Sequence, residues 1–211
     1  MLIDCGPDLR EQLLDAGAYR VDALLLTHAH ADHLHGIDDL RMVNRLNGKP
    51  IPLYASAGDL GEVERRFGYV LERPMPGKPL YRPALQAHEI AGPFEAAGLP
   101  VVPFVQGHGR VKTLGFRIGP LGYSTDVSEL DEAAFAALAG TELWIVDCMR
   151  REAHPTHCHV AKALAWIERV GPRRAVLTHM DQSLDYRELA AELPPGVEPG
   201  YDGLTIDLLG S

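Results

Sequence analysis

The stretch Thr27-His28-Ala29-His30-Ala31-Asp32-His33 decides how this chain is interpreted. It follows residues 21–26, an apolar run that predicts a buried strand. Residues two apart on an extended chain point to the same side, so His28 and His30 can face one metal ion. The motif therefore predicts a metal-binding loop at the carboxyl end of a strand.

Asp32 and His33 complete the motif at the start of a predicted helix, Leu34–Leu46. Imidazole and carboxylate groups are good ligands for zinc and similar divalent ions. Four such groups within six residues can serve two neighbouring ions. Spacing, residue types and the strand-then-helix context favour this interpretation over a polar loop that is merely rich in histidine.

The chain has 211 residues, enough for a single domain over 1–211 with a sizeable core. Its hydrophobic content of 46% and charged content of 23% are those of an ordinary soluble globular protein. The sequence contains no apolar run near the roughly 20 residues of a membrane span and shows no signal peptide. Its three scattered cysteines, Cys5, Cys148 and Cys158, do not suggest a disulfide framework, so we expect a reducing cytoplasm.

A formal net charge of −9 argues against a large nucleic-acid-binding surface. A local cationic pocket for one phosphate remains compatible with it. The expected partner is a small-molecule phosphodiester rather than a nucleic acid or a membrane. The sequence is compatible with a homodimer but does not reveal the oligomeric state.

Predicted strands alternate with predicted helices along the chain, which is typical of a layered α/β architecture. The further strands are predicted at residues 51–55, 101–106, 113–118, 121–123, 143–147, 175–178 and 204–209, and the further helices at 7–16, 57–66, 129–138, 159–170 and 186–193. Residues 67–93 are rich in proline and glycine and too long for an ordinary connector. They predict a lid or insertion loop.

The His-x-His-x-Asp-His motif resembles the metallo-β-lactamase fold superfamily, whose fold is a four-layer αββα sandwich. Leu2-Ile3-Asp4-Cys5-Gly6 resembles the first motif of that superfamily, which other strands normally precede. The resemblance implies that the first amino-terminal strands of the fold are missing. It also implies that Asp4 braces the metal loop through hydrogen bonds.

Three later residues match the superfamily's remaining ligands in order and context. His108 lies between two glycines after a strand, Asp126 follows Tyr123-Ser124-Thr125, and His179 follows the strand 175–178. The resemblance implies the following ligand sets: His28, His30 and His108 for one ion, Asp32, His33 and His179 for the other, and Asp126 bridging both. It implies a catalytic role for Asp32 as well.

Two ions held by a bridging carboxylate and a bridging hydroxide would lie about 3.5–4 Å apart. Their paired charge makes hydroxide, the expected nucleophile, available near neutral pH. Mixed histidine and aspartate ligation suits zinc or manganese, and iron also fits.

His154-Pro155-Thr156-His157-Cys158-His159 resembles a site of the superfamily's phosphodiesterases, in which a histidine contacts phosphate and acts as general acid. His157 is the match, and His154 and His159 are the competing candidates. An alkoxide is a poor leaving group, so hydrolysis of a phosphodiester requires a nearby proton donor.

The run from Leu2 to Arg41 looks most like the phosphoribosyl 1,2-cyclic phosphate phosphodiesterases of phosphonate breakdown. This resemblance implies a dinuclear-metal-dependent phosphodiesterase that hydrolyses a small, cyclic phosphodiester. Arg41, Arg150 and His159 are further candidates for contact with substrate.

Alternative functions from the same fold remain open. A tRNase Z-like endoribonuclease shares the ligand set, but it needs a basic surface. A glyoxalase II-like thioesterase carries a helical carboxyl-terminal domain that this short tail lacks. A flavodiiron protein has Glu where this chain has His30, and a true β-lactamase lacks the bridging aspartate. A non-catalytic remnant used as a binding module is the alternative from another class.

Overall fold

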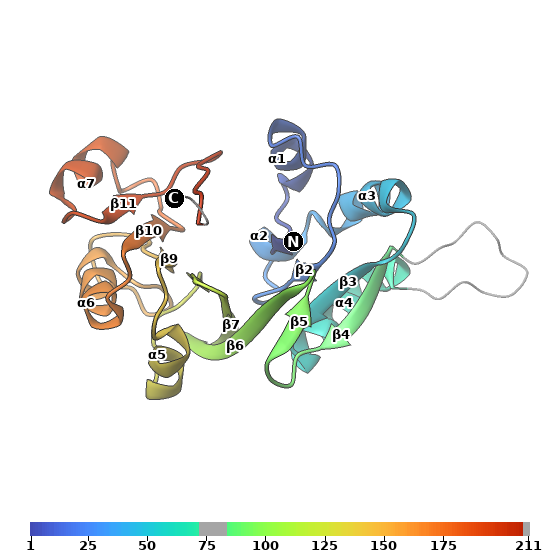
Figure 1. Cartoon of the computed structure of the whole chain (residues 1–211), viewed down its shortest axis with the longest axis horizontal. Helices are drawn as coiled ribbons and strands as arrows, with labels where there is room; N and C mark the ends of the chain where they lie inside the picture. The colour runs from blue at the N-terminus through green and yellow to red at the C-terminus, as the bar shows by residue number, and fades with distance from the viewer. Residues whose placement is uncertain (72–83, 209–211) are drawn as a thin grey trace, which may run out of the picture. The chain divides into compact units, whose positions relative to one another are not determined.

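The computed structural model describes residues 1–71 and 84–208 (Figure 1). The chain is an α/β protein with two sheets, as the sequence predicts. It divides into two compact units, Met1–Gly98 and Leu99–Ser211, which are described in turn. A single domain over the whole chain stays a prediction.

Unit 1 is built on a sheet of four parallel strands in sequence order. The strands are β1 (Leu2–Ile3), β2 (Leu24–Leu25), β3 (Ile51–Ala55) and β4 (Leu85–Glu89). Parallel neighbours need crossover connections. These contain α1 (Leu9–Asp15), α2 (Ala31–Leu34), the 3-10 helix η1 (Ile37–Asp39), α3 (Leu40–Asn47), α4 (Ala57–Phe67) and the 3-10 helix η2 (Gly68–Val70), and β5 (Phe94–Ala96) ends the unit.

The core of unit 1 follows from the apolar residues of these elements. In β3, Ile51, Leu53 and Ala55 are buried while the two residues between them are only half-buried, the alternation expected of a strand. These side chains belong to the same core cluster as Leu40 of α3 and Val63 of α4. Leu24 of β2 lies in this cluster as well, so the strand that precedes residues 28–33 is held in the core.

Unit 2 is built on a mixed sheet. Its strands, in spatial order, are β11 (Val197–Pro199), β10 (Arg174–Thr178), β9 (Leu143–Asp147), β8 (Leu121–Ser124), β7 (Val111–Ile118) and β6 (Leu99–His108). Strands β6 to β8 pair antiparallel, and β8 to β11 pair parallel. The helices of this unit are α5 (Glu132–Leu138), α6 (Val160–Val170) and α7 (Tyr186–Glu192).

The two faces of this sheet differ. Trp144 and Leu177 are buried in one cluster with Leu138 of α5, Ile167 of α6 and Leu189 of α7. The three helices therefore pack on the face that carries Trp144 and Leu177. Side chains alternate along a strand, so the residues next to Trp144 and Leu177 point to the opposite face.

Most predicted elements are present, with shifts at their ends. The predicted strand 143–147 is β9 as expected, whereas the strand predicted at 21–26 is reduced to the two residues of β2. The last predicted strand, 204–209, is wrong over its described residues 204–208, which form no strand. The sequence also missed β11, whose proline at one end weakens the strand signal.

The predicted helix Leu34–Leu46 is interrupted at Gly36. Its amide donates to the carbonyl of Cys5 at 2.8 Å, and a Cβ at this position would meet the Gly6 oxygen at 2.0 Å. This close approach requires glycine and ends α2 before η1 begins.

The lid predicted over 67–93 does not extend over its whole length. Gly68–Val70 form η2, and Leu85–Glu89 form β4, which pairs with β3. The region is rich in proline, but Leu85–Glu89 after the prolines still forms the last strand of the four-stranded sheet. Residues 72–83 lie outside the described residues.

Candidate metal centre

The motif of unit 1 forms a tight cluster at the carboxyl end of β2, here called the loop cluster (His28, His30, Asp32 and His33). His28 lies edge-on to His30, with ring centroids 4.3 Å apart, and 4.4 Å from the ring centroid of His33. Asp32 Oδ2 lies 3.3 Å from His33 Nε2. His30 is the N-cap residue of α2, so the helix begins within the motif and turns Asp32 and His33 back toward the strand end.

Asp4 braces this cluster, as the sequence predicts. Its Oδ2 accepts hydrogen bonds from His33 Nδ1 at 2.7 Å and from Thr27 Oγ1 at 2.8 Å, and its Oδ1 accepts from the Thr27 amide at 2.7 Å. Thr27 Oγ1 also lies 3.0 Å from His28 Nδ1. Because Nδ1 of both histidines is engaged by the protein, Nε2 is the nitrogen that each can offer to a metal.

Burial raises the pKa of Asp4, and the hydrogen bonds and charge of His33 together with the hydrogen bonds of Thr27 oppose this rise. Asp4 also has a positive φ of 61°. Such a conformation costs about 1–3 kcal/mol outside glycine and persists where the surrounding structure enforces it. The contacts with Thr27 and His33 are what enforce it here.

Helix α4 holds the loop cluster from a second side, which the sequence did not reveal. Asp59 Oδ1 accepts the Ala29 amide at 3.0 Å, and the Arg66 guanidinium donates to the Ala29 carbonyl. The two side chains of α4 therefore bind the amide and the carbonyl of Ala29, the residue between His28 and His30. Burial raises the pKa of Asp59, whereas hydrogen bonds from Ser56 and Ala29 lower it.

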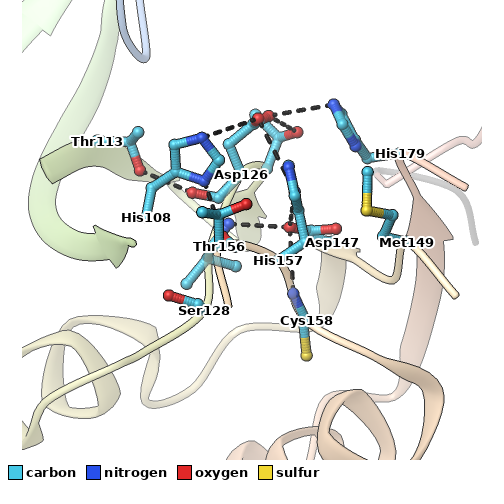
Figure 2. A network of polar contacts seen from close by, with 12 residues as sticks. His108, Thr113, Asp126, Ser128, Asp147, Met149, Thr156, His157, Cys158 and His179 are labelled. Carbon is cyan, nitrogen blue, oxygen red and sulfur yellow. Dashed lines mark hydrogen bonds and ion pairs between the residues drawn. The ribbon is translucent and has the colours of Figure 1, made fainter. Parts of the chain in front are cut away.

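Unit 2 carries the strand-end cluster (His108, Asp126, His157 and His179). His108 is the last residue of β6, Asp126 lies two residues beyond β8, and His179 directly follows β10. Figure 2 shows the side chains of His108, His157 and His179 converging on Asp126. The sequence predicted each of these positions, and the fold of unit 2 brings them together.

The distances in this cluster match a metal site better than hydrogen bonds. His179 Nε2 lies 3.5 Å from Asp126 Oδ2, and His108 Nε2 lies 3.8 Å from Asp126 Oδ1. Two ligands bound to one tetrahedral zinc ion at about 2.0–2.1 Å are roughly 3.3 Å apart. His108 Nδ1 lies 2.8 Å from the Thr156 carbonyl, which leaves Nε2 as the ligand atom. The donors present therefore fit a divalent ion.

The backbone is strained at the same places. Among the described residues other than glycine, positive φ angles occur at Asp126 (51°) and His179 (59°), and also at Asp4 and Ala97. Asp126 is held by Thr125 Oγ1, which donates to Oδ2 at 2.8 Å, and by Thr113 Oγ1, which donates to its carbonyl at 3.0 Å. Strain of this kind gathers at functional sites, where it fixes side-chain direction.

His157 is paired with a carboxylate that the sequence reasoning missed. Its Nδ1 lies 3.0 Å from Oδ2 of Asp147, a fully buried residue at the end of β9. The same oxygen accepts the Val127 amide at 2.9 Å. The ring of His157 stacks on His179 with centroids 4.8 Å apart. Asp147 is the one charged residue of the apolar run 143–147 and ends it, and this position was the available signal.

Ligand atoms of Asp147, His157 and His179 also lie within 4.8 Å of one another, a geometry that could hold an ion. The short contact between His157 Nδ1 and Asp147 favours an aspartate–histidine pair instead. Such a pair fixes the tautomer, so that Nε2 of His157 carries the exchangeable proton or the lone pair.

The two candidate arginines form ion pairs, and His154 Nδ1 lies 3.2 Å from Thr156 Oγ1. Arg41 forms an ion pair with Asp38 at 3.3 Å, and Arg150 Nε lies 3.2 Å from Asp181 Oδ2. His159 is the N-cap residue of α6, without a side-chain capping bond. Burial, with the charges of Arg150 and His157, lowers the pKa of His154. Substrate contact by these groups stays a prediction.

Residues 1–180 match the family model described as the beta-lactamase superfamily domain. The chain belongs to the beta-lactamase superfamily. The predicted metallo-β-lactamase fold and membership of a family of metal-dependent hydrolases are thereby confirmed. Every helix in the described parts of the chain is too short or too polar to span a membrane.

Two curated relatives are longer than this chain. It is 35% identical over 207 residues to an octanoyltransferase of Porphyromonas gingivalis, covering 97% of this chain and 41% of that protein. It is 32% identical over 127 residues to a ribonuclease Z of Methanopyrus kandleri, covering 56% of this chain and 39% of that one. The matched part of this chain thus spans less than half of each of these relatives.

Two solved structures are similar over most of the chain. A diphosphatase of the PhnP family has a TM-score of 0.87 and 30% identity, with 96% of this chain and 76% of that one covered. The short form of human tRNase Z has a TM-score of 0.74 and 19% identity, with 97% and 86% covered. At 19% identity, the similarity to tRNase Z shows a shared fold and nothing more.

Proposed function

We propose that this chain is a dinuclear-metal-dependent phosphodiesterase that hydrolyses a small, cyclic phosphodiester. The observation that carries the proposal is the aspartate–histidine pair Asp147–His157, set beside a cluster with metal-ligand spacing. The similarity to a solved diphosphatase supports phosphate chemistry.

The proposed ligands come from both clusters. One ion would be held by His28, His30 and His108, the other by Asp32, His33 and His179, with Asp126 between them. When bound, two divalent ions, zinc or manganese, would polarise the phosphate and acidify a water molecule. The roles of the protein are to hold the ligand nitrogens in the right tautomer, through Asp4 and Thr156, and to fix the direction of Asp126.

The presence of a proton donor favours a phosphodiester over a thioester as the substrate. Nε2 of His157 can donate a proton to an alkoxide as it leaves, and the buried carboxylate of Asp147 stabilises the imidazolium form needed for that donation. A thiolate leaves without such a donor. An aspartate–histidine pair beside the ligands is therefore useful to phosphodiester hydrolysis and dispensable for a thioesterase.

The deciding experiment is a hydrolysis panel on metal-loaded protein. The panel contains a ribose cyclic phosphate, 2′,3′-cyclic nucleotides, a chromogenic phosphodiester and a glutathione thioester. We expect turnover of the phosphodiesters and two ions per chain by elemental analysis. Turnover of the thioester alone, or one ion after saturation with zinc and manganese, would contradict the proposal.

A ribonuclease of the tRNase Z type is the second candidate, because ribonuclease Z relatives match parts of this chain. The net charge of −9 opposes it, since RNA binding needs a positively charged surface. Cleavage of a transfer-RNA precursor with its 3′ trailer, tested in the same panel, separates the two candidates. A cytoplasmic location and a homodimer stay predictions.

A further inference from the structure

The residues after β8 form the segment that carries Asp126, here called the Asp126 segment (residues 125–129). Its carbonyls at residues 125 and 126 and its amide at residue 127 are bound by polar side chains of β6, β7 and β9, namely Gln106, Thr113 and Asp147. All three side chains are buried. A buried peptide group without a partner is costly, so these contacts fix the first part of the segment to the sheet.

The other end of the segment is bound to the residues on both sides of His108. The Ser128 amide donates to the Gly107 carbonyl at 2.7 Å. The Ser128 hydroxyl donates to the same carbonyl at 3.2 Å and accepts the Gly109 amide at 3.3 Å. Ser128 is buried and lies two residues after Asp126, so this one residue supports the backbone of both His108 and Asp126.

Lys162 of α6 binds the carbonyl of this serine. Its Nζ donates to the Ser128 carbonyl at 2.6 Å and lies 5.3 Å from the centre of the Trp166 ring. A hydrogen bond from a charged donor is roughly twice as strong as one between neutral groups. The contact therefore ties α6 to the Asp126 segment.

The position of this lysine is not explained by the helix itself. Lys162 lies in the first turn of α6, where the helix dipole disfavours a positive charge. The same turn contains no acidic residue that would offset this charge. A residue that opposes its local preference but makes a specific tertiary contact is the pattern expected at a functional site.

We infer that Lys162 is a positioning residue for the strand-end cluster. By holding the Ser128 carbonyl it fixes the Asp126 segment, and through the Ser128 hydroxyl it fixes the peptide groups beside His108. The inference rests on the proposed function, in which His108 and Asp126 bind the ions. It adds a residue that binds neither ion nor substrate but sets where two of the ligands lie.

The first test uses metal-free protein and needs no turnover. Lys162→Met keeps a stem of similar length against Trp166 and removes the ammonium group. Amide hydrogen exchange, followed by NMR, should become about 10-fold faster at Ser128 and Gly107, because the segment opens more often. The Ala175 amide of β10 and the melting temperature should stay as in the wild type. If Lys162→Met unfolds, Lys162→Gln replaces it. Unchanged exchange at Ser128 and Gly107, or faster exchange throughout the chain, would overturn the inference.

The second test measures the affinity for zinc by competition with a chromogenic chelator. Lys162→Met should lower this affinity about 10-fold, the lower end of the effect of residues that support metal ligands. Lys162→Arg keeps a charged donor at this position and should restore most of the affinity. No loss in Lys162→Met, or a loss that Lys162→Arg does not restore, would overturn the inference. Both tests are read without substrate, so a protein that binds zinc but hydrolyses no phosphodiester would overturn the proposed function alone.

The matched control is Arg169→Met, at the other end of the same helix. Arg169 also places a cation over an aromatic ring, 3.7 Å from the centre of Phe135, and forms an ion pair with Glu132 at 2.5 Å. Both partners belong to α5 rather than to the Asp126 segment. The control should keep the exchange rate at Ser128 and the zinc affinity; changes equal to those of Lys162→Met would overturn the inference.

Discussion

The loop cluster of unit 1 and the strand-end cluster of unit 2 offer the same kinds of ligand but are assembled in different ways. The loop cluster comes from six consecutive residues, 28–33, and needs only a strand end and a helix start. The strand-end cluster collects His108, Asp126, His157 and His179 from four separate segments (Figure 2). A contiguous motif can therefore be recognised directly, whereas a dispersed one depends on the whole sheet that carries it.

The supports of the two clusters differ as well. Asp4 and Thr27 orient the imidazoles of the loop cluster through four contacts of 2.7–3.0 Å. In the strand-end cluster, Asp126 is fixed by strained backbone and by two threonine hydroxyls. Changes to the supports should thus weaken the loop cluster gradually, whereas the loss of Asp126 should disable the other cluster at once.

The largest expected effect is that of Asp126→Ala. The substitution removes the central carboxylate, so metal affinity should fall and turnover of a phosphodiester should drop by on the order of 100-fold or more. Metal content and kcat are the measurements. Asp8→Ala, at an exposed carboxylate, is the control. An Asp126→Ala variant with two ions and a normal rate would place the bridge elsewhere.

His157→Ala should have the second-largest effect, and its size should depend on the leaving group of the substrate. Diesters with a poor alkoxide leaving group should slow by roughly 10²–10⁴-fold, and nitrophenyl diesters far less, because nitrophenolate leaves without a proton. Asp147→Asn should show the same selectivity to a smaller degree. Loss of one ion in the His157→Ala variant would make His157 a ligand, and equal slowing of both substrates would make it a phosphate-binding group only.

Asp4→Ala tests the support of the loop cluster. Removing a carboxylate that holds metal-binding histidines typically lowers metal affinity about 10–100-fold. We expect the affinity for metal to fall within that range while saturating metal restores most of the activity. Competition with a chelator measures it. Asp59→Asn should have a smaller effect, since Asp59 accepts from the Ala29 amide and from Ser56 rather than from a ligand imidazole. A larger loss of affinity from Asp59→Asn than from Asp4→Ala would contradict this order.

The smallest effect concerns the cysteines beside the aspartate–histidine pair. Burial raises the pKa of Cys148 from 9.0 to about 12, and it also raises the pKa of Cys158. Both are fully buried, so neither should react with iodoacetamide at pH 8 until the protein is unfolded. Because their thiols ionise more readily in the unfolded chain, stability should fall as pH rises from about 9 toward 12. Alkylation of the native protein at pH 8, read by mass spectrometry, would contradict this.

The sequence predicted the α/β class, the metallo-β-lactamase fold and most of the central elements. Strand β9 and helix α6 carry strong local patterns, an apolar run and an amphipathic repeat, and their positions were predicted within one residue. Strand β11 was missed, and the segment 204–208 was wrongly predicted as a strand. Whether a short segment becomes a strand depends on a neighbouring strand to pair with, which the local sequence does not show.

For the candidate site, the residue types and spacing of the sequence alone predicted the loop cluster. The resemblance to the superfamily then named His108, Asp126, His157 and His179. Only the tertiary structure decided that Asp147 holds His157, that Asp59 and Arg66 hold Ala29, and that Lys162 holds Ser128. The hydrogen-bonded residues are 10 to 37 positions apart in the sequence. Contacts between residues so far apart are set by tertiary packing rather than by a local sequence pattern.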